Sequence, residues 1–177
     1  MTLSITVATP NYICQASDRR LVRLRADGAP ETYTDQAGKE LWLRLEDIRV
    51  LVTYHGIGED ATGTRTQAWL LEELKKADAS RSPIGEVFSE LAGQASLWVG
   101  NMYRKCPRSQ RRLLRHTFLA VGWHASGTPA LFQVSNFEHL ETGEEAQDPW
   151  LEFKSESSIL KPNTSRGVII ESCGLPK

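Results

Sequence analysis

The sequence predicts an α+β fold, in which antiparallel sheets and a pair of helices form separate layers of a single domain. Strand-like alternation fills the first third of the chain, helical periodicity follows, and strand patterns then return. Strands gathered in blocks around a helical pair are typical of α+β proteins rather than of alternating βα units. The length of 177 residues suits one domain, which we place at 1–177.

The strand pairs are predicted from alternation and turn residues. Apolar residues alternate with small or polar ones over residues 3–8, Pro10-Asn11 marks a turn, and a partner strand is expected over 12–18. Residues 21–38 are polar and predict a loop or a short extra hairpin. Two further strand pairs are expected, at 41–45 with 48–54 and at 117–123 with 130–134.

Helical periodicity predicts two consecutive helices, over 63–77 and 83–105. The second helix carries a continuous apolar stripe, and Ser82 is expected to cap it. The last 40 residues are polar and poorly patterned, and only two short runs there favour strands, near 150–153 and 167–170.

Composition argues against several classes of protein. Hydrophobic residues make up 40% of the chain and the formal net charge is −1, which fits neither a disordered chain nor a dedicated polyanion binder. No run approaches the roughly 18 apolar residues of a membrane helix. The N-terminus has no signal-peptide pattern, so we expect a cytoplasmic protein that does not bind membranes. Three cysteines and four histidines show no metal-ligand spacing, so no metal or cofactor is expected.

Two short motifs follow the predicted strands in a characteristic order. Ser17-Asp18-Arg19-Arg20 ends the first hairpin, and its aspartate lies sixteen positions after Thr2. Gly56-Ile57-Gly58-Glu59-Asp60 lies between the second strand pair and the first helix. In these motifs, their spacing and their context the chain resembles proteasome β subunits, which belong to the N-terminal nucleophile (Ntn) hydrolases. The resemblance covers roughly residues 2–136.

The resemblance implies an αββα sandwich of antiparallel sheets with the two helices packed on one face. It also implies a threonine peptidase or amidohydrolase that acts on a peptide or amide substrate. Thr2 would be the nucleophile once Met1 is removed. A threonine hydroxyl needs an adjacent base, and an N-terminal threonine supplies its own, because an α-amine titrates near pH 7.7–8.0.

The same resemblance assigns supporting roles around the nucleophile. Asp18 would orient a buried lysine, for which Lys39 stands in the right region, and the ammonium would lower the pKa of the threonine hydroxyl. Two alternatives stay open: Asp18 closes the turn after the second strand, with Arg20 as its candidate partner, or Lys39 is a solvated strand-edge residue.

Gly56 would direct its backbone N–H at the developing oxyanion, and the alternative is a plain turn glycine. Ser17 and Arg20, from the first motif, are supporting candidates. Ser135 is a third, because it matches a family serine near the nucleophile amine. An ordinary strand-end serine is the alternative for Ser135.

The chain also departs from the family pattern. Residues 137–177 show no second pair of helices, so the second helical layer is expected to be reduced or absent. The alternative function is therefore a catalytically inactive, proteasome-like protein that assembles with copies of itself, and in either case we expect a homo-oligomer. A basic run suggests a solvated loop or a subunit contact more than a nucleic-acid site. Its six cations are Arg104, Lys105, Arg108, Arg111, Arg112 and Arg115.

Overall fold

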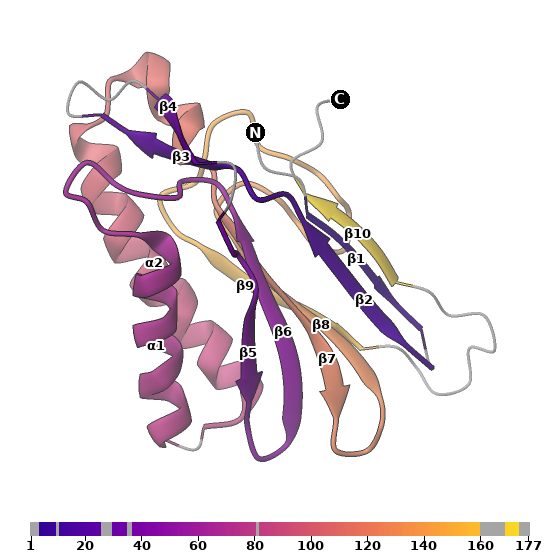
Figure 1. The fold of residues 1–177 in the computed structure, drawn as a ribbon. Helices are drawn as coiled ribbons and strands as arrows, with labels where there is room; N and C mark the ends of the chain where they lie inside the picture. Colours follow the sequence, from indigo (N-terminus) through magenta and orange to yellow (C-terminus); the bar gives the residue numbers. More distant parts are fainter. Residues whose placement is uncertain are drawn as a thin grey trace.

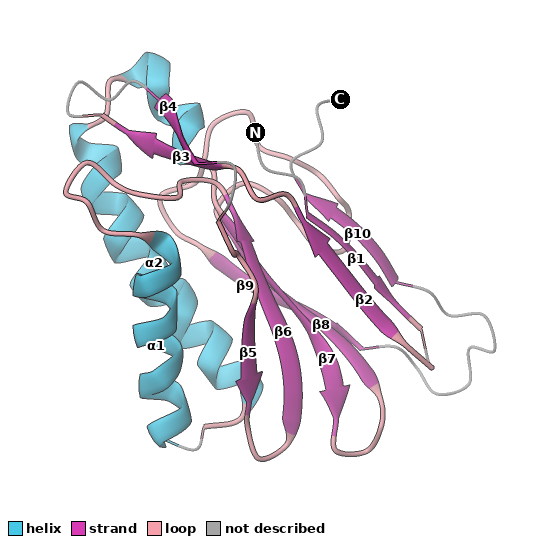
Figure 2. Ribbon diagram, in the orientation of Figure 1, coloured by secondary structure: helices cyan, strands magenta, loops and turns pink. Residues whose placement is uncertain are grey.

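The computed structural model describes residues 4–9, 11–25, 30–34, 37–80, 82–159 and 169–173. Within these residues the chain forms ten β-strands, two α-helices and one 3-10 helix. They are arranged as a helical layer, a central sheet and a smaller sheet (Figure 1, Figure 2). The predicted α+β class is confirmed.

The central layer is a five-stranded antiparallel sheet whose strands follow one another in chain order. Its strands are β5 (Leu41–Arg44), β6 (Ile48–His55), β7 (Thr117–His124), β8 (Pro129–Ser135) and β9 (Lys154–Ile159). The register of β6 and β7 pairs Ile48 with His124 at one end and His55 with Thr117 at the other. Successive side chains in each strand point to opposite faces, so the sheet has two surfaces of independent composition.

Helices α1 (Thr66–Ser80) and α2 (Ile84–Lys105) cover one face of this sheet, and the 3-10 helix η1 (Arg108–Leu114) follows them. Helix α2 packs on β8 and β9, and α1 contacts both α2 and β5. The shared core is apolar, and Phe88 of α2 stacks on Phe132 of β8. No helix in the described ranges has the length and apolar character that a bilayer crossing requires.

The helix predictions are confirmed in type and order, with corrections at their starts. Helix α1 begins at Thr66, three residues later than expected. Ser82 does not cap α2, because Pro83 occupies the N-cap position and makes no side-chain capping bond.

A three-stranded sheet of β1 (Ser4–Ala8), β2 (Ile13–Ser17) and β10 (Ile169–Cys173) covers the other face, with β1 in the middle. Figure 1 shows it on the side of the central sheet away from the helices. Strands β3 (Leu21–Leu24) and β4 (Pro30–Thr34) form the separate hairpin that the sequence left as one of two options.

The small sheet has an unusual orientation. Ser4, Thr6 and Ala8 of β1 are buried toward the central sheet, whereas Ile5 is 40% exposed on the outer face. The more polar face of β1 therefore points inward.

The C-terminal strand predictions are partly wrong. The run at 150–153 forms no strand, and β9 begins only at Lys154. Strand β9 has the sequence KSESSI and is mostly exposed, so it lacks the apolar signal by which strands are recognised. In the run at 167–170, Ile169 begins β10, and residues 167 and 168 lie outside the described ranges.

Candidate functional site

The layer between the two sheets changes character along its length. At one end the buried side chains are apolar, and they include Ala8, Leu119, Val121, Leu131 and Leu140. At the other end, which we call the polar end, the two sheets bury mainly polar side chains. These are Ser4, Thr6, Thr53, His55, Thr117, Gln133 and Ser135. Burying polar groups costs free energy unless their hydrogen bonds are satisfied, so this concentration marks the polar end as a candidate site.

The ion pair between Lys39 and Asp18 belongs to this end. Lys39 lies just before β5 with 1% of its side chain exposed, and its Nζ is 2.6 Å from Oδ1 of Asp18, which follows β2 and is 33% exposed. The Ala37 N–H donates to the Arg19 carbonyl at 3.0 Å and holds the segment before β5 beside the end of β2. The structure thus brings Asp18 and Lys39 together, and the alternative of a solvated Lys39 is wrong.

Burial and charge act on Lys39 in opposite directions. Burial lowers the pKa of the Lys39 ammonium, whereas the Asp18 carboxylate, by hydrogen bond and charge, and Glu40, by charge, counteract part of that shift. A buried cation next to one carboxylate is suited to stabilise a nearby developing anion, because few water molecules screen its charge.

The strand that leads to the predicted nucleophile is joined to the Asp18 turn. Thr2 itself lies outside the described residues, as does Met1. Ser4 pairs with Ser17 in the register of β1 and β2, and Ser4 Oγ donates to Ser17 Oγ at 3.2 Å. Ser17 Oγ in turn donates to the Asp18 carbonyl at 3.2 Å. Ser17 therefore connects the start of β1 to the turn that carries Asp18.

Gly56 follows β6 in a conformation that only glycine adopts readily. Its φ is +118°, and a Cβ there would lie 2.5 Å from His116 Nδ1 and 2.6 Å from the Arg115 carbonyl oxygen. The Ile57 N–H donates to His116 Nδ1 at 3.2 Å and fixes the turn. The turn alone explains the glycine, so the role of its N–H toward an oxyanion stays a prediction.

Asp60, the last residue of the second motif, organises the loop before α1. Its Oδ1 accepts hydrogen bonds from the N–H and hydroxyl of Thr62 and from the N–H of Thr64, and its Oδ2 accepts one from Trp98 Nε1. Burial alone would raise the pKa of Asp60, but these hydrogen bonds hold it below its ordinary value. Asp60 is thus a structural anchor outside the inter-sheet layer.

The other two supporting candidates are Ser135 and Arg20. Ser135 ends β8, and its Oγ accepts hydrogen bonds from Thr117 Oγ1 at 2.8 Å and from the N–H groups of Phe137 and Glu138. It is part of the polar end, but it acts there as a turn-forming serine. Arg20 is exposed, two residues beyond Asp18.

His55 is a residue of the polar end that the sequence analysis missed. It directly precedes Gly56 and is buried, its ring packs edge-on against Phe137, and its Nε2 has no hydrogen-bond partner among the residues that the structure describes. Burial, together with the charge of Lys39, lowers the pKa of His55 to about 3, while Asp18 opposes the shift. His55 is therefore a neutral imidazole close to the ion pair, and its position before the motif glycine was the available signal.

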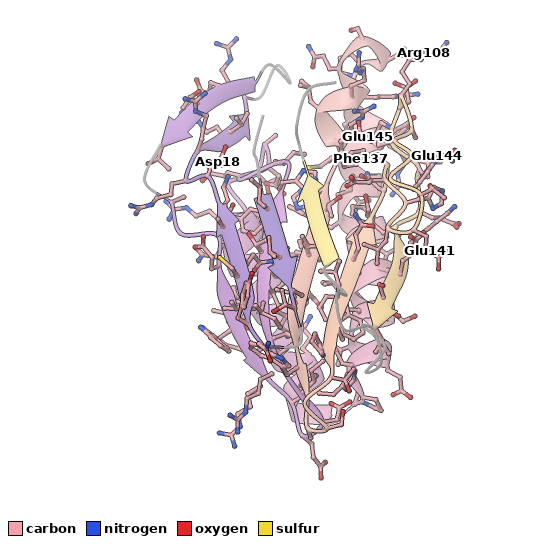
Figure 3. All side chains as sticks on the ribbon, turned by 90° about the vertical axis from the view of Figure 1, so that its right-hand side faces the viewer. Asp18, Arg108, Phe137, Glu141, Glu144 and Glu145 are labelled. Atoms are coloured by element: carbon pink, nitrogen blue, oxygen red, sulfur yellow. The ribbon has the colours of Figure 1, made fainter. Side chains whose placement is uncertain are left out.

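Two cations of the basic run, Arg111 and Arg115, contact their own chain. The guanidinium of Arg111 lies 4.3 Å from the Tyr103 ring, and that of Arg115 lies 5.0 Å from the Phe137 ring and donates to the Gln147 carbonyl at 2.8 Å. Figure 3 shows Arg108 along the same edge as Glu141, Glu144 and Glu145 of the loop between β8 and β9. It shows Asp18 at the end of the small sheet. The edge that carries the basic run is therefore mixed in charge.

No protein-family model, curated protein or solved structure matches this chain. Among the residues that the structure describes, no three His, Cys, Asp or Glu side chains form a group that would hold a metal ion.

Proposed function

We propose that this protein is an N-terminal threonine amidohydrolase or peptidase of the proteasome β-subunit type, with Thr2 as the nucleophile after removal of Met1. The observation that carries the proposal is the buried Lys39 ammonium, 2.6 Å from Asp18 at the polar end of the inter-sheet layer. Strand β1, which follows Thr2, runs along the same layer.

The layer order also supports an Ntn-hydrolase fold. Two antiparallel sheets face each other, and the helical pair inserted between β6 and β7 covers one of them. The small sheet has no described helix on its outer face, which agrees with a reduced second helical layer. In this arrangement the proposed site lies between the sheets, where water is partly excluded and a fixed charge acts strongly.

The reaction that we propose proceeds through an ester. Thr2 Oγ would attack the amide carbonyl carbon, a C–O bond would form, and the hydroxyl proton would pass to the Thr2 α-amine. The negative charge on the carbonyl oxygen would be received by the Gly56 N–H. Cleavage of the C–N bond would then release the amine with the transferred proton, and water would hydrolyse the ester to regenerate Thr2.

Lys39 would favour the anionic form of Oγ through its charge, and Asp18 would hold the ammonium in place. Because nucleophile and base belong to one residue, Thr2→Ala is expected to remove nearly all activity. Asp18→Asn keeps the shape of the side chain and should cost less than loss of Lys39.

Intact-mass measurement after treatment with a β-lactone, which acylates activated hydroxyls, tests the proposal. The expected result is a chain without Met1 that carries one adduct, mapped to Thr2. Lys39→Met should reduce labelling about 10³-fold, whereas Lys75→Met, at an exposed lysine paired with Glu72 on α1, should leave it unchanged. A chain that retains Met1 and takes no adduct would overturn the hydrolase proposal.

A specific observation favours a second candidate, a self-assembling protein without catalysis. The outer face of the small sheet carries Ile5 and Val7 of β1 beside Ala16 and Cys14 of β2, so its exposed side is apolar. Exposed apolar patches often mark interaction sites. Sedimentation at micromolar concentration should show a homo-oligomer that Ile5→Glu dissociates. A wild-type monomer would count against assembly in both candidates.

A further inference from the structure

A hollow of about 820 Å³ lies on the helical side of the molecule, away from the inter-sheet layer. Its walls come from the loop before α1, from both helices and from the end of η1. The main apolar side chains are Trp69 of α1, Trp98 and Met102 of α2, and Leu114 of η1. The volume falls within the roughly 300–1,000 Å³ typical of small-molecule sites, which are likewise lined mainly by apolar and aromatic groups.

The aromatic wall is held in place before any ligand arrives. The rings of Trp69 and Trp98 stack with their centroids 4.7 Å apart and an interplanar angle of 17°. Trp98 Nε1 donates to Asp60 at 3.1 Å, and the other oxygen of Asp60 is bound by the loop of Thr62 and Thr64. A flat ligand therefore meets a fixed surface and loses little free energy to ordering of the protein.

The charged side chains of the lining are Asp60, Lys105 and Arg25, which leaves an excess of one positive charge. Both oxygens of Asp60 already accept hydrogen bonds, and Lys105 and Arg25 add two cations to the lining. Lys105 forms no ion pair within the described part of the chain, and its side chain is exposed. Burial raises the pKa of the Cys106 thiol, although the charge of Arg111 acts to lower it. Cys106 therefore lines the hollow as an uncharged thiol.

From this juxtaposition we propose that the hollow binds a small, flat aromatic anion. The aromatic body lies against Trp98, Trp69 and Met102, and a carboxylate or a similar group faces Lys105. This binding does not depend on the hydrolase activity.

Titration with 2-naphthoate, followed by two-dimensional NMR of the tryptophan indole N–H signals, tests the proposal. The signals of Trp69 and Trp98 should shift saturably. Trp42, which is 74% exposed on β5, serves as an internal control for unspecific aromatic contact and should not shift. Equal shifts at Trp42, or no saturable shift up to the solubility limit of the probe, would overturn the proposal.

The role of charge is tested with 2-naphthamide, a neutral probe of nearly the same shape. Lys105→Met should weaken naphthoate binding by about two- to fivefold, as expected for an exposed ion pair, and should leave naphthamide binding unchanged. Lys75→Met is the matched control and should change neither affinity. If Lys105→Met weakens both probes equally, the assignment of the anionic group is wrong.

Ala61→Trp, at an exposed loop position in the lining, should fill the hollow and abolish binding while the other indole signals keep their positions. Self-association provides a further check. If the signals of Trp69 and Trp98 instead move with protein concentration in the absence of probe, the hollow contacts a second copy and the small-molecule proposal fails.

Discussion

The two faces of the central sheet differ in the chemistry of their buried side chains. The face toward the helices is mainly apolar, with Val50, Val52 and Phe118 packed under α1 and α2. The face toward the small sheet is apolar at one end and polar at the other, although the same strands supply both faces. Burial alone therefore does not distinguish a stabilising core from a candidate site, whereas the chemistry of the buried groups does.

The small sheet also has one more polar and one more apolar face, and here the more polar face is the buried one. Thr6 of β1 is turned inward, and its hydroxyl accepts a hydrogen bond from Gln15 Nε2 at 3.1 Å, whereas Ile5 is turned outward. A sheet that served stability alone would bury its more apolar face. The inward polar face gives up apolar burial, which is a common feature of functional sites.

The largest expected effect is on the helical face. Phe88→Ala should lower the free energy of unfolding by about 3–5 kcal/mol, because it removes a fully buried ring stacked on Phe132 and leaves a cavity. Urea unfolding followed by circular dichroism measures this. A loss below about 1 kcal/mol would mean that the helical layer is not the main source of stability.

At the polar end we expect a large effect on activity and a small effect on stability. Lys39→Met should reduce hydrolysis or β-lactone labelling about 10³-fold, as for the loss of other preorganised charge-stabilising groups. Its effect on the free energy of unfolding should stay below about 1.5 kcal/mol, because the variant removes the cost of burying a charge and leaves Asp18 one-third exposed. Unfolding and labelling measured on the same sample separate the two effects. If Lys39→Met unfolds more readily but its folded fraction reacts at the wild-type rate, Lys39 has a structural role and not a catalytic one.

Acid should destabilise the fold through a histidine on each side of the sheet. Burial, more than the charge of Lys39, lowers the pKa of His55 to about 3, and burial lowers the pKa of His116 well below 6.5. Below pH 6.5 the unfolded chain binds protons that the folded chain does not, so stability falls as pH falls. Well inside this pH window, each histidine lowers the free energy of unfolding by about 1.4 kcal/mol for each unit by which the pH falls.

Urea unfolding at several pH values between 7.5 and 4.5 tests this expectation. Below about pH 5 lowered carboxyl pKa values, such as that of Asp60, add to the slope, so the difference between wild type and His55→Gln isolates the histidine. His55→Gln should remove about half of the slope due to the pair. An unchanged slope in this variant would contradict the neutral, buried imidazole.

The smallest expected effect is a gain. Thr53 is buried in β6 on the inter-sheet face, and within the described part of the chain its hydroxyl has no hydrogen-bond partner. Thr53→Val keeps the shape and removes that unsatisfied group, so it should stabilise the fold by about 1 kcal/mol. Thr6→Val is the matched control and should cost about as much, because the Thr6 hydroxyl accepts the hydrogen bond from Gln15. A loss of stability in Thr53→Val would indicate an additional partner for its hydroxyl.

Local patterns were sufficient to predict the hairpin of β1 and β2, the helical pair and the hairpin of β7 and β8, because turn residues and periodicity act over neighbouring positions. They failed at β9, whose Ser- and Glu-rich strand is held by pairing with β8. The pairing of β10 with β1 joins the two ends of the described chain, and no local signal specifies it.

For the candidate site, the sequence by itself determined which residues to examine: Asp18 at the end of a hairpin, Lys39 before a strand and Gly56 at a turn. It could not determine which way Lys39 points, because this residue precedes β5 and strand alternation does not extend to it. The tertiary structure decides that direction, since the hydrogen bond from Ala37 to Arg19 brings the lysine to Asp18. Only the tertiary structure, likewise, shows that His55 is buried beside this pair, because burial depends on the packing of both sheets.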